Sequence, residues 1–128
     1  MPSIQVARVI ISFSWLYHGI FPKLVQIAPL EMVMTTSLGL SNELSYLVIK
    51  LTGIIEIAFG ILFFIYYRSK RIILLNIIAL SSLLCFVTFM QPHLLIEAFN
   101  PVTTNLPLIA LSFILLNEIK RESRLLEK

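Results

Sequence analysis

The stretch L-S-Y-L-V-I-K-L-T-G-I-I-E-I-A-F-G-I-L-F-F-I-Y-Y, residues 44–67, decides the fold of this chain. It holds only two charged side chains, Lys50 and Glu56, in 24 residues. A helix needs about 20 mostly apolar residues to cross the hydrocarbon core of a bilayer. Backbone groups inside the bilayer must satisfy their own hydrogen bonds, so an isolated apolar run of this length spans as a helix. The stretch therefore predicts a transmembrane helix.

Three other apolar runs accompany it, at 4–20, 72–90 and 102–116. The last run reaches 18 residues when its helix starts near Asn100 and ends at Asn117. The first run ends in aromatic residues, a proline and a lysine instead of a small-residue cleavage site, so we read it as a retained span and not as a signal peptide. The sequence predicts one all-α domain over residues 1–128, an integral membrane four-helix bundle. Its spans are expected at about 4–20, 44–67, 72–90 and 100–117.

Composition agrees with a membrane protein. Apolar residues make up 58% of the 128 residues and charged residues 13%, against about 25% charged residues in soluble domains. The mean hydropathy is +0.92. The net charge of +3 does not indicate a nucleic-acid partner, because the charges lie at the ends of apolar runs and form no patch. With one cysteine, Cys85, two histidines and no aspartate, neither an intrachain disulfide nor a metal site is expected. We expect Cys85 to be a small buried hydrophobic residue.

Basic residues predict the orientation of the spans. Eight of them fall on one side of the predicted topology, and only Lys23 and Lys50 fall on the other. The eight are Arg8, Arg68, Lys70, Arg71, Lys120, Arg121, Arg124 and Lys128. The positive-inside rule makes their side cytoplasmic, so both termini face the cytoplasm and the loops 21–43 and 91–99 face outward. Within the first outer loop, residues 29–39 predict a short interfacial helix that begins at Pro29 and ends before Gly39, and Ser41 is expected to cap the second span.

Glu56 is the most unusual residue of the second span. A carboxylate in hydrocarbon costs several kcal/mol unless it is paired, hydrated or protonated. Thr52, Gly53 and Gly60 share its helix face, and small residues let a neighbouring helix or a ligand approach closely. We therefore expect Glu56 to face the bundle interior, either in a ligand- or proton-handling role or as a structural, hydrogen-bonded carboxyl group.

The first span ends in W-L-Y-H-G-I-F-P-K, residues 15–23. Trp15, Tyr17 and His18 suit an aromatic belt at the membrane interface, although Trp15 and His18 also share a helix face on which a titratable imidazole could line a pocket. Lys23 is expected to cap the helix end or to extend to the headgroups, and Lys50 to reach the outer surface.

The last two spans carry further polar residues. In the third span, Ser81, Cys85 and Thr88 form a stripe expected to serve helix contacts, with Asn76 on the opposite side. In the fourth span, Asn100 and Pro101 predict a capped helix start.

Thr103, Thr104 and Asn105 lie further in and precede Pro107, which removes one helical hydrogen bond. Polar side chains beside a weakened helix suit a cavity wall. We expect a pocket that opens to the outer side, with Glu56 at its floor. The candidate pocket residues are Trp15, Tyr17, His18, Lys23, Glu56, Asn100, Thr104 and Asn105, with Gln91 and His93 in the same outer half.

Three segments of this chain, 15–23, 53–60 (G-I-I-E-I-A-F-G) and 99–106 (F-N-P-V-T-T-N-L), resemble the signature segments of the DoxX-like membrane proteins. The resemblance implies a compact four-helix protein of the bacterial inner membrane. Relatives in the wider group include a subunit of thiosulfate:quinone oxidoreductase and components of membrane redox complexes. Some closer relatives are fused to a nucleotide-binding domain, but this chain has no G-x-G-x-x-G motif.

Three functions are compatible with these observations. The first is a redox-linked subunit that binds a quinone or another lipophilic molecule without covalent attachment, with His18 or Glu56 handling protons. The second is a non-catalytic scaffold for other membrane or redox subunits, and the third, ranked last, is a small-solute carrier. The expected partners are the lipid bilayer, other membrane or redox subunits and further copies of the chain in a homo-oligomer. Whether the protein is an enzyme stays open.

Overall fold

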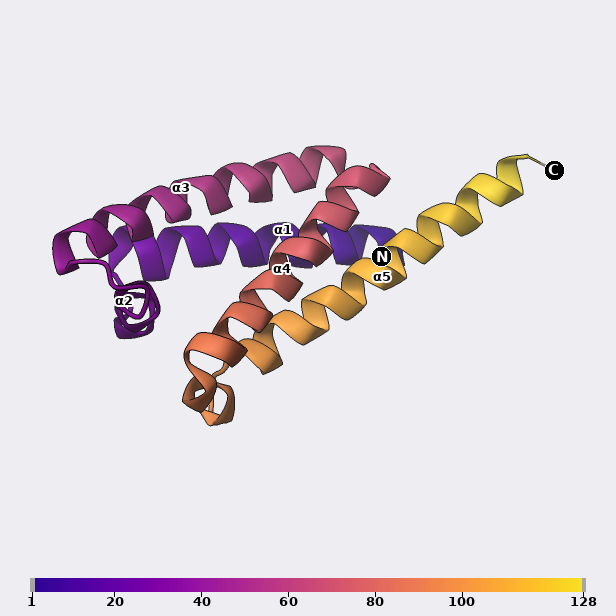
Figure 1. Ribbon diagram of the computed structural model, residues 1–128. Coiled ribbons are helices and arrows are strands. Elements are labelled where there is room, and N and C mark those ends of the chain that lie inside the picture. Colours follow the sequence, from indigo (N-terminus) through magenta and orange to yellow (C-terminus); the bar gives the residue numbers. More distant parts are fainter. Residues whose placement is uncertain (1, 128) are drawn as a thin grey trace.

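The computed structural model describes residues 2–127 and is helical throughout its length (Figure 1). Helix α1 (Ser3–Ile20) continues into a π-helical turn, η1 (Phe21–Val25), and the short helix α2 (Pro29–Thr36) follows. The long helices α3 (Asn42–Tyr66) and α4 (Lys70–Met90) come next. A 3₁₀ turn, η2 (Pro92–Ile96), then leads to α5 (Pro101–Leu126).

Four helical segments are long and apolar enough to cross a membrane. They are Ser3–Val25, Asn42–Tyr66, Lys70–Met90 and Pro101–Leu126, and they confirm the predicted all-helical fold with four spans. The protein is thus a multi-pass membrane protein whose outward-facing apolar side chains contact lipid.

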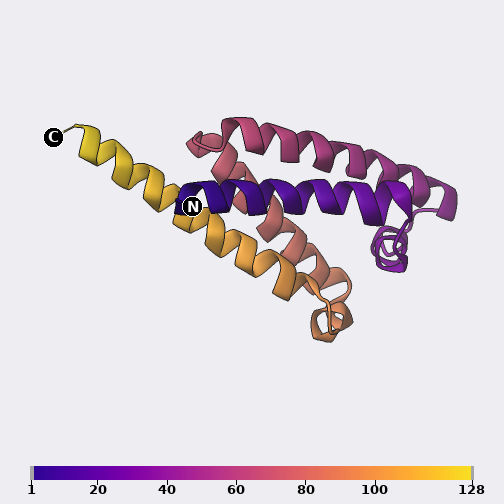
Figure 2. The same ribbon diagram turned by 180° about the vertical axis from the view of Figure 1, so that it is seen from behind.

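Helix α5 is longer than the sequence predicted and runs nine residues past Asn117. Its last part is charged and projects beyond the other helices (Figures 1 and 2). Glu122 accepts a hydrogen bond from Arg68 at 2.9 Å there, and Glu118 lies 3.9 Å from Arg121 one turn along the helix. The second contact is an i,i+3 pair of the kind that stabilises a helix in water, and apolarity alone therefore underestimates the length of α5.

The predicted helix starts are confirmed. The Ser41 side chain accepts a hydrogen bond from the Leu44 N–H at 3.3 Å, and Asn100 Oδ1 accepts two, from Val102 at 2.9 Å and Thr103 at 3.1 Å. Helix α2 occupies the predicted loop segment, and Gly39 follows it with φ of 79°, a conformation that favours glycine.

The four long helices form two antiparallel pairs, α1 with α3 and α4 with α5 (Figures 1 and 2). The pairs contact each other near the end that carries both termini, which we call the terminal end. They diverge toward the opposite end, which carries η1, α2 and η2 and which we call the loop end. The apolar core, including Ile11, Phe63, Ile73 and Leu115, fills the region where the pairs meet. At the loop end a cavity lies between the two pairs.

Glycines set the distance between α1 and α3. A β-carbon on Gly19 would lie 2.6 Å from the Gly53 carbonyl oxygen, and one on Gly53 would lie 2.9 Å from Lys23 Cβ. The backbones therefore touch where any larger side chain would separate them. The small-residue face of the second span has the packing role that the sequence suggested.

One expectation for the third span is wrong, because Cys85 is exposed and not buried. Asn76 lies on the side of α4 opposite Cys85 and is fully buried. Its Oδ1 accepts a hydrogen bond from Trp15 Nε1 at 2.6 Å, and its Nδ2 donates to Ser112 Oγ at 2.7 Å. Asn76 thus joins α1, α4 and α5 in one polar bridge.

Candidate functional site

The π-helical turn η1 positions the central residue of the site. Pro22 cannot donate the usual helical hydrogen bond, and the chain closes a wider turn in which the Gln26 N–H donates to the Phe21 carbonyl at 3.1 Å. Single π turns often occur at functional sites. Lys23 lies within this turn and is only 7% exposed.

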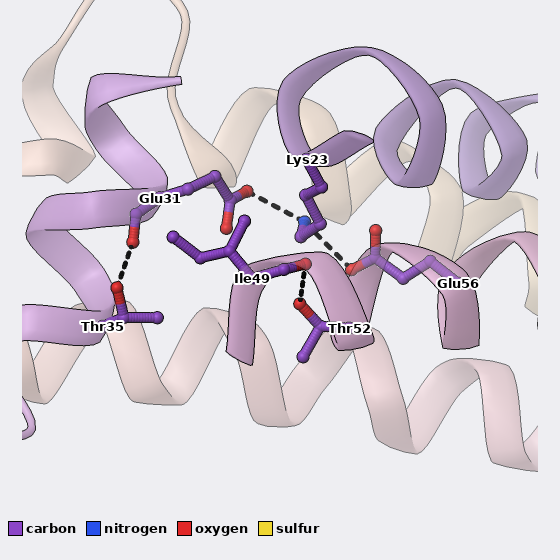
Figure 3. Close-up of polar contacts among 6 residues, drawn as sticks. All are labelled: Lys23, Glu31, Thr35, Ile49, Thr52 and Glu56. Carbon is purple, nitrogen blue, oxygen red and sulfur yellow. Dashed lines mark hydrogen bonds and ion pairs between the residues drawn. The ribbon is translucent and has the colours of Figure 1, made fainter. Parts of the chain in front are cut away.

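Lys23 binds two carboxylates. Its Nζ lies 2.9 Å from Glu31 Oε1 on α2 and 3.1 Å from Glu56 Oε1 on α3 (Figure 3). The expectation that Lys23 would cap the helix or extend to the headgroups is therefore wrong. The glycine at position 53 explains the difference, because it lets the Lys23 stem pass close to α3 toward Glu56.

The three charged groups sit on three different elements and hold them together. Glu31 lies in the first turn of α2, where a negative charge is favourable at a helix N-terminus. The nearby hydroxyls take no part in the ion pairs: Thr35 donates to the Glu31 carbonyl at 2.8 Å and Thr52 to the Ile49 carbonyl at 2.9 Å (Figure 3). The Lys23 ammonium is thus the shared partner of two acids, one in the loop helix and one in a membrane span.

Lys50 also turns inward at the loop end. Its Nζ donates a hydrogen bond to the Leu24 carbonyl at 2.6 Å and lies 5.4 Å from the Tyr46 ring centroid. The sequence suggested that it reaches the outer surface, but the π-helical turn leaves a carbonyl oxygen within its reach. Lys50 therefore ties the end of the first span to α3.

A cavity of about 810 Å³ opens between the two diverging helix pairs. Apolar side chains of α4, among them Leu80, Leu83 and Phe86, line one wall, and residues of α2 close part of the loop end. All eight candidate residues from the sequence line this one cavity. They are Trp15, Tyr17, His18, Lys23, Glu56, Asn100, Thr104 and Asn105. Gln91 and His93 are not among the lining residues, because they lie in and beside η2, beyond the end of α4.

The aromatic residues of α1 separate into two kinds. Tyr17 is half exposed, and its ring centroid lies 5.9 Å from that of Phe13 and 4.8 Å from that of Phe21, as expected for a belt at the membrane interface. Trp15 instead packs edge-to-face on Phe59, with centroids 4.9 Å apart, while its indole N–H bonds Asn76. The His18 ring lies beside Tyr17 at 6.2 Å and borders the cavity.

Most polar groups on the α5 wall already have partners. Asn100 caps the helix through Oδ1 and donates through Nδ2 to the Glu97 carbonyl at 2.6 Å. The Thr104 hydroxyl donates to the Asn100 carbonyl at 3.1 Å. Asn105 differs, since it is 6% exposed and its Nδ2 has no hydrogen-bond partner among the described residues.

A second buried atom at this cavity lacks a partner within residues 2–127. Glu56 Oε1 pairs with Lys23, but Glu56 Oε2 accepts no hydrogen bond. Buried polar atoms of folded proteins are nearly always paired, so each exception calls for an explanation. Two residues that line the cavity, Glu56 on α3 and Asn105 on α5, thus each have one buried polar atom without a partner.

Sequence reasoning missed Glu31 as part of this site. The available signal was that Glu31 is the only charged residue between Leu24 and Asn42. Its pairing with Lys23 depends on the turn at Gln26–Ala28, whose direction no sequence pattern reveals.

The sequence model of the DoxX-like family matches residues 12–113. That range contains all eight candidate residues and Glu31. No curated protein and no solved structure matches the chain.

Proposed function

Because the chain belongs to the DoxX-like family of membrane proteins, and because a cavity with one charged end lies between its spans, we propose that it is a quinone- or lipophile-binding subunit. In this proposal it serves a redox process of the bacterial inner membrane. The supporting observation is the combination of apolar walls from α4 with the buried Lys23–Glu56 ion pair at one cavity. Ligand sites of this type are mostly apolar, with a few convergent polar groups that orient the ligand.

The residues of the cavity fit a quinone-class molecule. The apolar side chains Leu83 and Phe86 can contact a ring and its lipid tail, and the free Asn105 Nδ2 can donate to a ring oxygen. Such a molecule, when bound, supplies two-electron redox chemistry coupled to proton transfer. Glu56 and His18 are two of the titratable groups that line the cavity, and either can accept a proton from a ring hydroxyl.

Ligand binding can be measured with the fluorescence of Trp15, the single tryptophan of the chain, which lines the cavity. We expect decylubiquinone to quench this fluorescence saturably in detergent micelles. Thr104→Phe fills part of the cavity and should weaken binding about tenfold or more, since overpacking costs about 1–3 kcal/mol.

Thr88→Phe is the matched control. Thr88 also lies on a span and donates its hydroxyl hydrogen to a helix carbonyl, that of Leu84 at 2.8 Å, but it does not line the cavity. This variant should bind like the wild type. Absence of saturable quenching in the wild type, or equal affinities of the two phenylalanine variants, would refute binding in this cavity.

We also propose that the terminal end faces the cytoplasm. The distribution of basic residues supports this orientation, and the two remaining lysines, Lys23 and Lys50, are engaged in contacts inside the protein. In a Cys85→Ser background, Thr36→Cys should react in intact cells with a membrane-impermeant maleimide. Ser69→Cys should react only after the membrane is permeabilised, and the opposite pattern would contradict the orientation.

A further inference from the structure

The two unpartnered atoms of the cavity come from opposite helix pairs. Glu56 belongs to α3 and Asn105 to α5, and both residues line the cavity between the diverging pairs. Among residues 2–127, the other buried side-chain atoms without partners are Ser12 Oγ and Ser45 Oγ, which belong to residues that do not line this cavity. The free donor and the free acceptor are therefore specific to the candidate site.

The chemistry of the two atoms defines what a ligand must offer. Glu56 lies 3.1 Å from the Lys23 ammonium, and a neighbouring positive charge favours its ionised form. As a carboxylate, its free Oε2 can only accept a hydrogen bond. Asn105 Nδ2 can only donate. If a bound ligand leaves either atom unpaired, that atom still carries the desolvation penalty of a buried polar group.

We infer that the cavity selects a lipid-soluble molecule whose polar end both donates and accepts, with a ligand hydroxyl donating to Glu56 Oε2 and a ligand oxygen accepting from Asn105 Nδ2. This inference rests on the proposed function, and within the quinone class it selects the reduced, dihydroxy form. The oxidised form carries only acceptor oxygens and leaves the Glu56 oxygen unsatisfied. One bound molecule also bridges α3 and α5 across the diverging ends of the helix pairs.

The test compares the two redox forms of one probe. Decylubiquinol and decylubiquinone are titrated anaerobically into the wild-type protein in detergent, and their affinities are measured by calorimetry. We expect the reduced form to bind about tenfold more tightly, the difference that one hydrogen bond to a charged group provides. Tighter binding of the reduced form makes the bound couple easier to reduce, by about 30 mV for each tenfold preference.

Two variants test whether the preference for the reduced form comes from Glu56 and whether Asn105 contributes to binding. Glu56→Gln can present an amide N–H in place of the free carboxylate oxygen, so the preference should disappear or reverse in favour of the oxidised form. Asn105→Leu removes the donor, so both forms should bind about tenfold more weakly. Its thermal stability should not fall, because an unpaired buried amide is replaced by a side chain of similar size. The control Thr88→Val should keep the wild-type preference.

The outcomes separate this inference from the proposed function. If neither form binds the wild type, the proposed function fails and the inference fails with it. If both forms bind but the oxidised form is equal or tighter, the inference is overturned and quinone-class binding stands. A preference for the reduced form that survives in Glu56→Gln also overturns the assignment to Glu56.

Discussion

Replacing Lys23 by methionine should destabilise the protein by about 3 kcal/mol, at the lower end of the range for removing one partner of a buried ion pair. Methionine preserves the apolar stem, so the loss comes from the missing ammonium. Glu31 and Glu56, whose side chains are 18% and 17% exposed, then lose their shared cation. The free energy of unfolding can be measured by titration with sodium dodecyl sulfate, followed by circular dichroism.

Lys120→Met is the control for this change. Lys120 is exposed on the projecting part of α5, and surface substitutions of this kind usually change stability by less than about 0.5 kcal/mol. If both lysine variants are as stable as the wild type, the ion pairs of Lys23 do not hold the loop end together.

Replacing Gly19 by alanine should be the second strongly destabilising change. The new β-carbon would meet the Gly53 carbonyl oxygen at 2.6 Å and Ile57 Cγ1 at 2.8 Å. Since the oxygen belongs to backbone, α1 and α3 must move apart, and we expect a net loss of about 2 kcal/mol. The same titration measures it, and movement of these helices should also loosen the Lys23–Glu56 contact.

Two comparisons make the glycine prediction specific. At Gly60 a β-carbon would have its nearest neighbours at 3.1 Å, so Gly60→Ala should be milder than Gly19→Ala. Ala58→Leu adds more bulk on the exposed side of α3 and should be neutral. A Gly19→Ala protein as stable as the wild type would contradict the close contact between α1 and α3.

The sequence predicted the spans and caps well because their causes are local. Apolar runs of membrane length must form helices, and Ser41 and Asn100 cap helices through atoms two or three residues away. The end of α5 was predicted less well, since charged residues continue the helix beyond its apolar run, with Glu118 and Arg121 paired one turn apart. The hydropathy of a sequence indicates where the apolar membrane span ends, but the helix can continue beyond that point.

The sequence grouped residues that line one cavity, but it did not predict the contacts that they make. Polar residues at similar depths in a small membrane protein have few places to gather, and all eight candidates line one cavity. The inward direction of Lys23 depends on a π-helical turn, and the burial of Asn76 depends on how α4 faces Trp15. Both are results of tertiary packing, which the spacing of residues along one helix does not encode. Binding of a ligand by these residues stays a prediction.

The candidate site depends most on the ion pair that Lys23 and Glu56 form between the membrane spans at the cavity. A double-mutant cycle of Lys23→Met and Glu56→Leu, with free energies of unfolding measured for all four proteins, tests it most directly. The double variant removes both charges of the pair, so it should be less destabilised than the sum of the single variants, with a coupling energy of about 2 kcal/mol. Additive effects, with a coupling energy near zero, would contradict the ion pair.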